Sequence, residues 1–159
     1  MRIVVCVKHV PDMQSERRFE GGRLVRGEDD VLNELDENAI EAAVQMKEAE
    51  EDAGREAEVI ALTMGPEDAE DALMRALQMG ADRAFLVSDE FLEGSDVITT
   101  ASVLSVAIAK VSEECGPVDL VVTGMASLDA MTSMLPGALA AKAHMPLLGL
   151  ARTLSVADG

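Results

Sequence analysis

The sequence predicts an α/β domain in which helices cover both faces of a mostly parallel sheet. Short runs rich in Val, Ile and Leu alternate with longer segments whose apolar residues recur every three or four positions. The short runs are apolar on both faces, which is typical of parallel strands buried between helices. At 159 residues and 48% apolar content, the chain is long enough for one domain with a sizeable core, expected to span residues 1–159.

Each expected strand is a short apolar run that ends at a proline, a glycine or a polar residue. In chain order, the strands are expected at residues 2–8, 57–65, 83–88 and 118–124, with a possible fifth at 148–159. The first of them, "RIVVCVK", is rich in β-branched residues and is bounded by Pro11. The irregular segment that follows contains Gly21 and Gly22, a pair that predicts a small hairpin.

Each expected helix carries an apolar stripe and a residue suited to one of its ends. In chain order, the helices are expected at residues 32–54, 65–80, 94–116 and 135–144. Asn33 or Asp36 is expected to cap the first helix, and Ser95 the third. Pro66 stands at the first position of the second helix, where its missing N–H removes no helical hydrogen bond.

The acidic composition excludes several classes of function. With 13 basic and 30 acidic residues, the net charge is −17, and no basic face is expected for a nucleic acid or an anionic membrane. A bound phosphate would therefore have to be held by backbone N–H groups rather than by a cluster of Lys and Arg. No apolar run is long enough to cross a membrane, and no signal segment is evident, so a cytoplasmic location is expected.

Few side chains suggest catalysis or metal binding. Cys6 and Cys115 lie far apart in sequence and are expected to be small core residues of a reduced compartment. His9 and His144 form no ligand-spaced cluster with them, so no metal site is expected. No Ser/His/Asp arrangement is recognisable, so no catalytic residue is assigned. The ten methionines are expected to fill the core.

A ligand of an open parallel sheet binds beyond the carboxyl ends of the strands. At this edge, Lys8 and His9 follow the first expected strand, where they could line a nucleotide or be an ordinary polar strand exit. Gly65 and Pro66 follow the second, but neither a dinucleotide fingerprint nor a P-loop is present. That turn alone indicates only the start of a helix.

The richest loop at this edge follows the fourth expected strand, in "VDLVVTGMASLDAMTSMLPGALAAKAH". Gly124 would let the chain turn sharply, and Ser127, Thr132 and Ser133 offer hydroxyl donors suited to a phosphate. Asp129 would repel a phosphate unless its side chain faces away, holding the loop's own amides or a sugar hydroxyl. From the residues alone, the loop is either a phosphate cradle or only a connection.

Five stretches occur in a suggestive order: "RIVVCVKHVPD", "LNELDENAIEAA", "GPEDAEDALMRALQMGADRAFLVSD", "GSDVITTA" and "DLVVTGMASLDAMTSMLPGALAA". Together they resemble the β subunit of electron transfer flavoproteins, and the resemblance covers essentially the whole chain. It implies a three-layer α/β/α sandwich with a mostly parallel sheet, of the adenine-nucleotide-binding, Rossmann-like kind.

The resemblance also implies a function, cofactors and partners. Such a β subunit pairs with an α subunit that holds most of a shared FAD, and in many members β buries one AMP, usually regarded as structural. The FAD accepts electrons from acyl-CoA-type dehydrogenases, and β performs no catalysis alone. Carried onto this sequence, the implied AMP-binding residues are Cys6, Asn33, Asp36, Met64, Gly124, Ala126, Asp129, Thr132 and Ser133.

The sequence departs from the family pattern in two places. From Asp129 to Pro136 the loop is one residue shorter, Ala130 stands where a glycine is usual, and Met131 and Met134 replace small or polar residues. Fewer glycines permit fewer close backbone approaches, which weakens the expectation of AMP binding. Family members also continue for about another hundred residues, a domain-sized length, so the chain is either a fragment or a natural short relative.

Two other functions fit the same fold. The first is a stand-alone module similar to universal stress proteins, which would bind ATP or AMP and act as a homodimer. The second is a small enzyme that hydrolyses an adenylate bond, for which no clear catalytic set is present.

Overall fold

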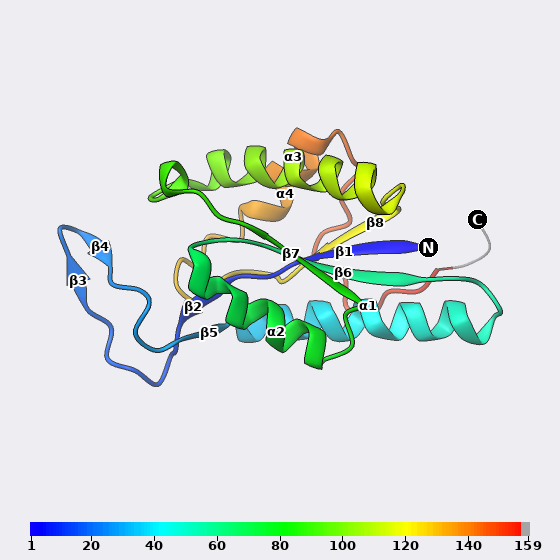
Figure 1. The fold of residues 1–159 in the computed structure, drawn as a ribbon, viewed down its shortest axis with the longest axis horizontal. Helices are drawn as coiled ribbons and strands as arrows, with labels where there is room; N and C mark the ends of the chain where they lie inside the picture. The colour runs from blue at the N-terminus through cyan, green and yellow to red at the C-terminus, as the bar shows by residue number, and fades with distance from the viewer. Residues whose placement is uncertain (157–159) are drawn as a thin grey trace.

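The computed structural model of the chain describes residues 1–156 and contains a parallel sheet between two layers of helices (Figure 1). The sheet strands are β1 (Arg2–Cys6), β6 (Glu58–Met64), β7 (Arg83–Val87) and β8 (Leu120–Thr123). Their order across the sheet is β7-β6-β1-β8, and every neighbouring pair is parallel. The predicted fold class and the four main strands are therefore confirmed.

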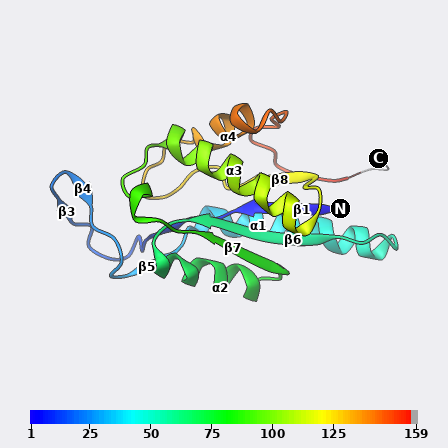
Figure 2. The same cartoon turned by 45° about the horizontal axis from the view of Figure 1, so that its top comes forward.

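Two helices cover each face of the sheet (Figure 2). The helices are α1 (Glu34–Asp52) and α2 (Glu70–Gln78) on one face, and α3 (Val97–Cys115) and α4 (Leu135–Ala143) on the other. Short 3₁₀ helices precede α2 and α3, namely η1 (Glu67–Ala69) and η2 (Glu90–Leu92). Alternate strand residues point to opposite faces, so that Ile3 and Val5 pack with α1, and Val4 and Cys6 pack with α3.

A separate antiparallel segment projects beyond the carboxyl edge of the sheet (Figure 1). Its base pairs β2 (His9–Pro11) with β5 (Asp30–Leu32), and its tip pairs β3 (Phe19–Glu20) with β4 (Arg23–Leu24). Gly21 and Gly22 form the turn with φ of 56° and 79°, values that suit glycine, which confirms the predicted hairpin. We call residues 12–29 the arm.

Two expected elements differ in the structure. Residues 148–156 form no strand, and the remainder of the expected fifth strand, 157–159, lies outside the described residues. Leu148 and Leu150 are exposed, so this stretch lacks the buried face that would favour a strand in the sheet. Asp96, not Ser95, caps α3: its carboxylate accepts from the amide of Thr99 at 2.7 Å, whereas the Ser95 hydroxyl donates to the Leu92 carbonyl.

The expectation that the methionines fill the core is wrong for half of them. Branched aliphatic residues and alanines make up most of the core, to which Met46 contributes. Five methionines have about half or more of their surface exposed: Met13, Met74, Met125, Met131 and Met134. Within residues 1–156, no helix is long and apolar enough to cross a membrane.

Candidate functional site

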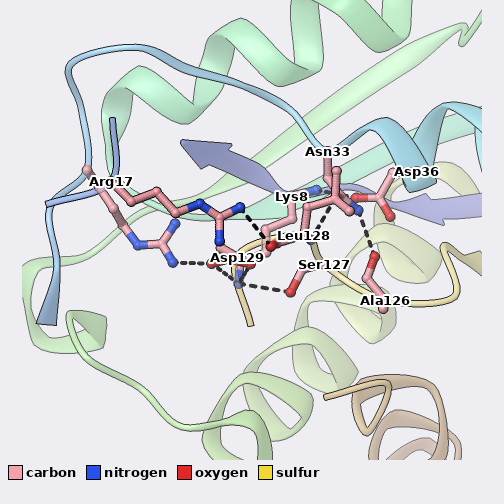
Figure 3. Close-up of polar contacts among 9 residues, drawn as sticks. Lys8, Arg17, Asn33, Asp36, Ala126, Ser127, Leu128 and Asp129 are labelled. Carbon is pink, nitrogen blue, oxygen red and sulfur yellow. Dashed lines mark hydrogen bonds and ion pairs between the residues drawn. The ribbon is translucent and has the colours of Figure 1, made fainter. Parts of the chain in front are cut away.

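The loop after β8, residues 124–134, is held against the start of α1 by Asn33 (Figure 3). Asn33 Nδ2 donates to the carbonyl oxygen of Ala126 at 2.9 Å, and the amide of Leu128 donates to Asn33 Oδ1 at 3.0 Å. Because Asn33 is fully buried, these bonds satisfy polar groups that water does not reach. Asn33 occupies the cap position of α1, as one of the two expected caps, but its side chain makes no capping hydrogen bond and instead holds the loop.

Asp36, in the first turn of α1, ties that helix to the ends of β1 and β8. Its Oδ2 accepts from the backbone amide of Lys8 at 2.9 Å. A Cβ on Gly124 would lie 2.1 Å from Asp36 Oδ1 and 3.0 Å from the carbonyl oxygen of Leu35. Gly124 has no positive φ, so the close approach of α1, rather than a sharp turn, explains the glycine.

Burial raises the pKa values of two groups beside this contact. It raises the pKa of Asp36 to about 7, although hydrogen bonds from Asn33 and the Lys8 amide act in the opposite direction. Burial also raises the pKa of the Cys6 thiol to about 12, and the charge of Asp36 adds to this effect. Cys6 is therefore an unreactive core thiol at the end of β1, as the sequence predicted.

Asp129 is the buried acid of the loop, and two cations pair with it (Figure 3). Its side chain is 1% exposed. Lys8 Nζ lies 3.0 and 2.8 Å from the two carboxylate oxygens of Asp129, and 3.4 Å from Ser127 Oγ. The guanidinium of Arg26, from the arm, pairs with Asp129 Oδ2. The carboxylate thus faces protein cations.

The electrostatic consequence is a firmly ionised carboxylate. Burial alone would raise the pKa of Asp129, but hydrogen bonds from Lys8 and Arg26, together with the charge of Lys8, hold this pKa well below its usual range. Asp129 is therefore neutralised within the protein and does not present its charge to an approaching anion.

A second arginine of the arm reaches the same loop. Arg17 Nη2 donates to the carbonyl oxygen of Leu128 at 3.2 Å. Lys8, Arg17 and Arg26 thus surround loop residues 127–129, where Asp129 is the one acid of the loop. The arm thus brings two arginines to the loop after β8, beside Lys8, which the sequence did not suggest. That backbone N–H groups would hold a phosphate here stays a prediction.

The remaining predicted positions are more dispersed. Ala126 is buried and contributes its carbonyl to Asn33, whereas Thr132 and Ser133 lie in an exposed stretch of the loop. Met64 is half-buried at the end of β6, and β1 separates this strand from β8. The contact of these residues with a nucleotide stays a prediction, as it does for Asn33 and Asp36, whose side chains hold protein groups.

The short form of the loop is accommodated with backbone strain. Met131 and Ser133 adopt φ of 52° and 51°, a region that non-glycine residues rarely occupy. Ala130, where the resemblance led us to expect a glycine, does not adopt such a φ. Met125, Met131 and Met134 are each more than half exposed, so they point outward and do not plug the edge.

Two buried side-chain atoms at this edge have no hydrogen-bond partner among the described residues: His9 Nε2, just after β1, and Thr63 Oγ1, near the end of β6. Such orphaned groups are unusual in a folded protein. In the part of the chain that the structure describes, no group of three or more His, Cys, Asp or Glu is placed to hold a metal ion.

Sequence reasoning missed Arg17 and Arg26 and the role of the arm. A signal existed in the composition, because four of the chain's 13 basic residues fall within positions 17–26. Their meeting with Leu128 and Asp129 spans more than 100 positions of sequence, which local patterns do not reveal.

Comparison with known proteins places this geometry in a family. A family model described as the electron transfer flavoprotein domain matches residues 22–159. The electron transfer flavoprotein subunit beta of Mycobacterium leprae is 38% identical over 99% of this chain and 59% of that protein. The Caffeyl-CoA reductase-Etf complex subunit CarD of Acetobacterium woodii is 37% identical over 99% of this chain and 58% of that protein. Protein FixA of Azorhizobium caulinodans is 39% identical over 86% of this chain and 48% of that protein.

These relatives are longer than the chain, which spans less than two thirds of their length. The match nevertheless covers every element of the sheet after β1 and the whole of the loop at 124–134. The resemblance seen in the sequence is thereby confirmed. The chain belongs to the electron transfer flavoprotein domain family, on the side of the β subunit.

Proposed function

We propose that this chain serves as an electron transfer flavoprotein β-type subunit, which binds AMP at the carboxyl edge of its sheet and pairs with an α subunit that carries FAD. The observation that carries the proposal is the loop at 124–134, which Asn33 anchors at that edge of a chain belonging to this family.

The residues present at the edge fit an adenine nucleotide. The loop keeps its hydroxyls, Thr132 and Ser133, on the exposed side, and its acid, Asp129, is neutralised by Lys8 and Arg26. An anion approaching the loop would therefore meet donors and positive charge rather than a free carboxylate. The adenosine part would lie toward Cys6 and Met64, at the ends of β1 and β6.

In this proposal, the chain does no chemistry alone. The AMP would act as a structural ligand, and the FAD held mainly by the α subunit would carry electrons from acyl-CoA-type dehydrogenases. The name of the CarD relative, a subunit of a Caffeyl-CoA reductase-Etf complex, supports assembly into a complex. The free thiols Cys6 and Cys115 support action in a reducing compartment, for which we propose the cytoplasm.

Native mass spectrometry of the purified chain tests the proposal. We expect one AMP per chain, or uptake of one AMP on addition, and no flavin absorbance in the chain alone. Mixed with an FAD-carrying α subunit, the chain should form a one-to-one complex on size exclusion. A chain that takes up no AMP and forms no such complex contradicts the proposal, and an ATP-bound homodimer would favour the stand-alone module instead.

A further inference from the structure

The arm lies across the carboxyl edge and touches the loops that follow three sheet strands. Arg17 and Arg26 contact residues 128 and 129 after β8. Arg23 pairs with Glu93, which follows β7, at 3.3 Å. Gly27 lies against Asp68, after β6, because a Cβ at Gly27 would stand 3.2 Å from that carboxylate. The arm is therefore a strap over the edge where the ligand of a parallel sheet binds.

The middle of the arm, residues 16–26, is locally basic, although Asp12, Glu28 and Asp29 make the whole arm slightly acidic. Four arginines fall within residues 16–26, against Glu16 and Glu20, in a protein whose net charge is −17. Arg18 and Arg23 are paired with exposed glutamates, Glu28 and Glu93.

The positive charge at the loop exceeds what its own acid requires. Arg17 is bound to a backbone carbonyl, and Lys8 and Arg26 share the single carboxylate of Asp129. Two solvent-facing cations, Lys8 and Arg26, therefore share the one carboxylate of the loop.

In these ion pairs the cations are partly exposed to solvent, whereas the carboxylate is buried. The Lys8 and Arg26 side chains are 40% and 38% exposed, whereas the Asp129 side chain is 1% exposed. An anion that comes from solvent can therefore contact both cations while Asp129 stays behind them. Asp129 then acts as a positioning residue that holds the two cations side by side.

We infer that the arm is part of the nucleotide site: Arg26, together with Lys8, binds the phosphate of an adenine mononucleotide, and the bound phosphate fastens the arm over the edge of the sheet. This inference rests on the proposed function and adds to it the residues that recognise the phosphate. A phosphate dianion would meet two partly exposed cations there, and charge-assisted bonds of this kind are the strong ones.

Calorimetric titration with AMP and with adenosine tests the phosphate contact. For Arg26→Gln, AMP affinity should fall roughly tenfold to a hundredfold, the effect of losing one charge-assisted hydrogen bond, while adenosine affinity stays the same. Arg26→Lys should recover part of the loss. Arg23→Gln is the matched control, because Arg23 lies on the same arm but pairs with an exposed glutamate, and its AMP affinity should equal that of the wild type.

Limited trypsin digestion tests the fastening independently, since the arm contains cleavable bonds after Arg17, Arg18, Arg23 and Arg26. AMP should slow cleavage in the arm several-fold, and adenosine should not. Arg17→Gln, which leaves both ion pairs of Asp129 in place, should speed cleavage of the free protein at the other three sites, so the test does not depend on Arg26 variants folding.

The outcomes separate this inference from the proposed function. If wild-type protein binds AMP but Arg26→Gln binds it equally well, or AMP leaves arm cleavage unchanged, the inference is overturned and the proposed function stands. If wild-type protein binds no AMP, both are overturned.

Discussion

Replacement of Gly124 by alanine tests the central contact of the site. The added Cβ would stand 2.1 Å from Asp36 Oδ1 and 3.0 Å from the Leu35 carbonyl oxygen, and the second of these is backbone that cannot simply rotate away. To relieve the overlap, Asp36 must move, and its buried hydrogen bond with the Lys8 amide is then lost or weakened.

The cost follows from these two contacts. Loss of a buried hydrogen bond to a charged group costs about 1.5–3 kcal/mol. Crowding against the backbone of α1 adds about 1–3 kcal/mol, as overpacking of a filled interior usually does. The free energy of unfolding should therefore fall by roughly 3–6 kcal/mol, which for a chain of this size lowers the melting temperature by roughly 10–20 °C.

Urea and thermal unfolding followed by circular dichroism measure this effect. Gly137→Ala is the matched control, because that glycine lies within α4 and a Cβ there meets nothing within 4 Å. It should stabilise the protein by about 0.5–1 kcal/mol through helix propensity alone.

A double-mutant cycle assigns the clash to its partner. In an Asp36→Ala background, the additional cost of Gly124→Ala should fall by at least half, because the nearest overlap is gone. The reasoning would be refuted if Gly124→Ala melted at the wild-type temperature, or if it lowered the free energy of unfolding equally with Asp36 and with Ala at position 36.

Three further predictions concern the groups around this contact. Because the pKa of Asp36 is raised to about 7, the native state binds more protons than the unfolded state between about pH 4 and 7. Ionisation of Asp36 therefore lowers the free energy of unfolding as pH rises through this range. Asp36→Asn should remove that slope, which denaturation at several pH values would detect. The pKa of Asp129 is lowered, so its ionised form stabilises the native state above about pH 4, and this stabilisation is lost as pH falls. Asp129→Asn should therefore lower the free energy of unfolding most at neutral pH. An equal loss of stability at pH 3 would contradict this. Asn33→Ala should lower the free energy of unfolding by about 2–4 kcal/mol in the same assay, because it leaves a carbonyl and an amide of the loop without partners. A loss below about 1 kcal/mol would mean that water replaces both hydrogen bonds.

The fold could be predicted from the sequence because its signals are local. The runs at β1 and β6 are apolar on both faces, and the helices between strands repeat their buried residues every three or four positions, as Ala72, Leu73 and Ala76 do in α2. The hairpin at Gly21 and Gly22 was equally local, since it needs only two residues that tolerate positive φ.

The prediction failed where a residue's role depends on a partner far along the chain. Asn33 reads as a helix cap and does stand at the cap position, yet the loop about 93 positions away takes both of its polar atoms. Methionines read as core filler, but the packing of smaller aliphatic residues leaves five of them largely outside. In both cases the residue type fits the local pattern, but packing against residues far along the chain decides which contacts its side chain makes.

The same distinction limits what the net charge says about a local group of cations. A value of −17 describes the average surface, whereas recognition of an anion depends on the few charges within about one Debye length of it, about 8–10 Å at physiological salt. Lys8 leaves β1 at the carboxyl edge because the strand ends there, and Arg26 reaches the same acid because the arm turns back at its two glycines. The acidic composition therefore gave no sign that Lys8, Arg17 and Arg26 gather beside this loop.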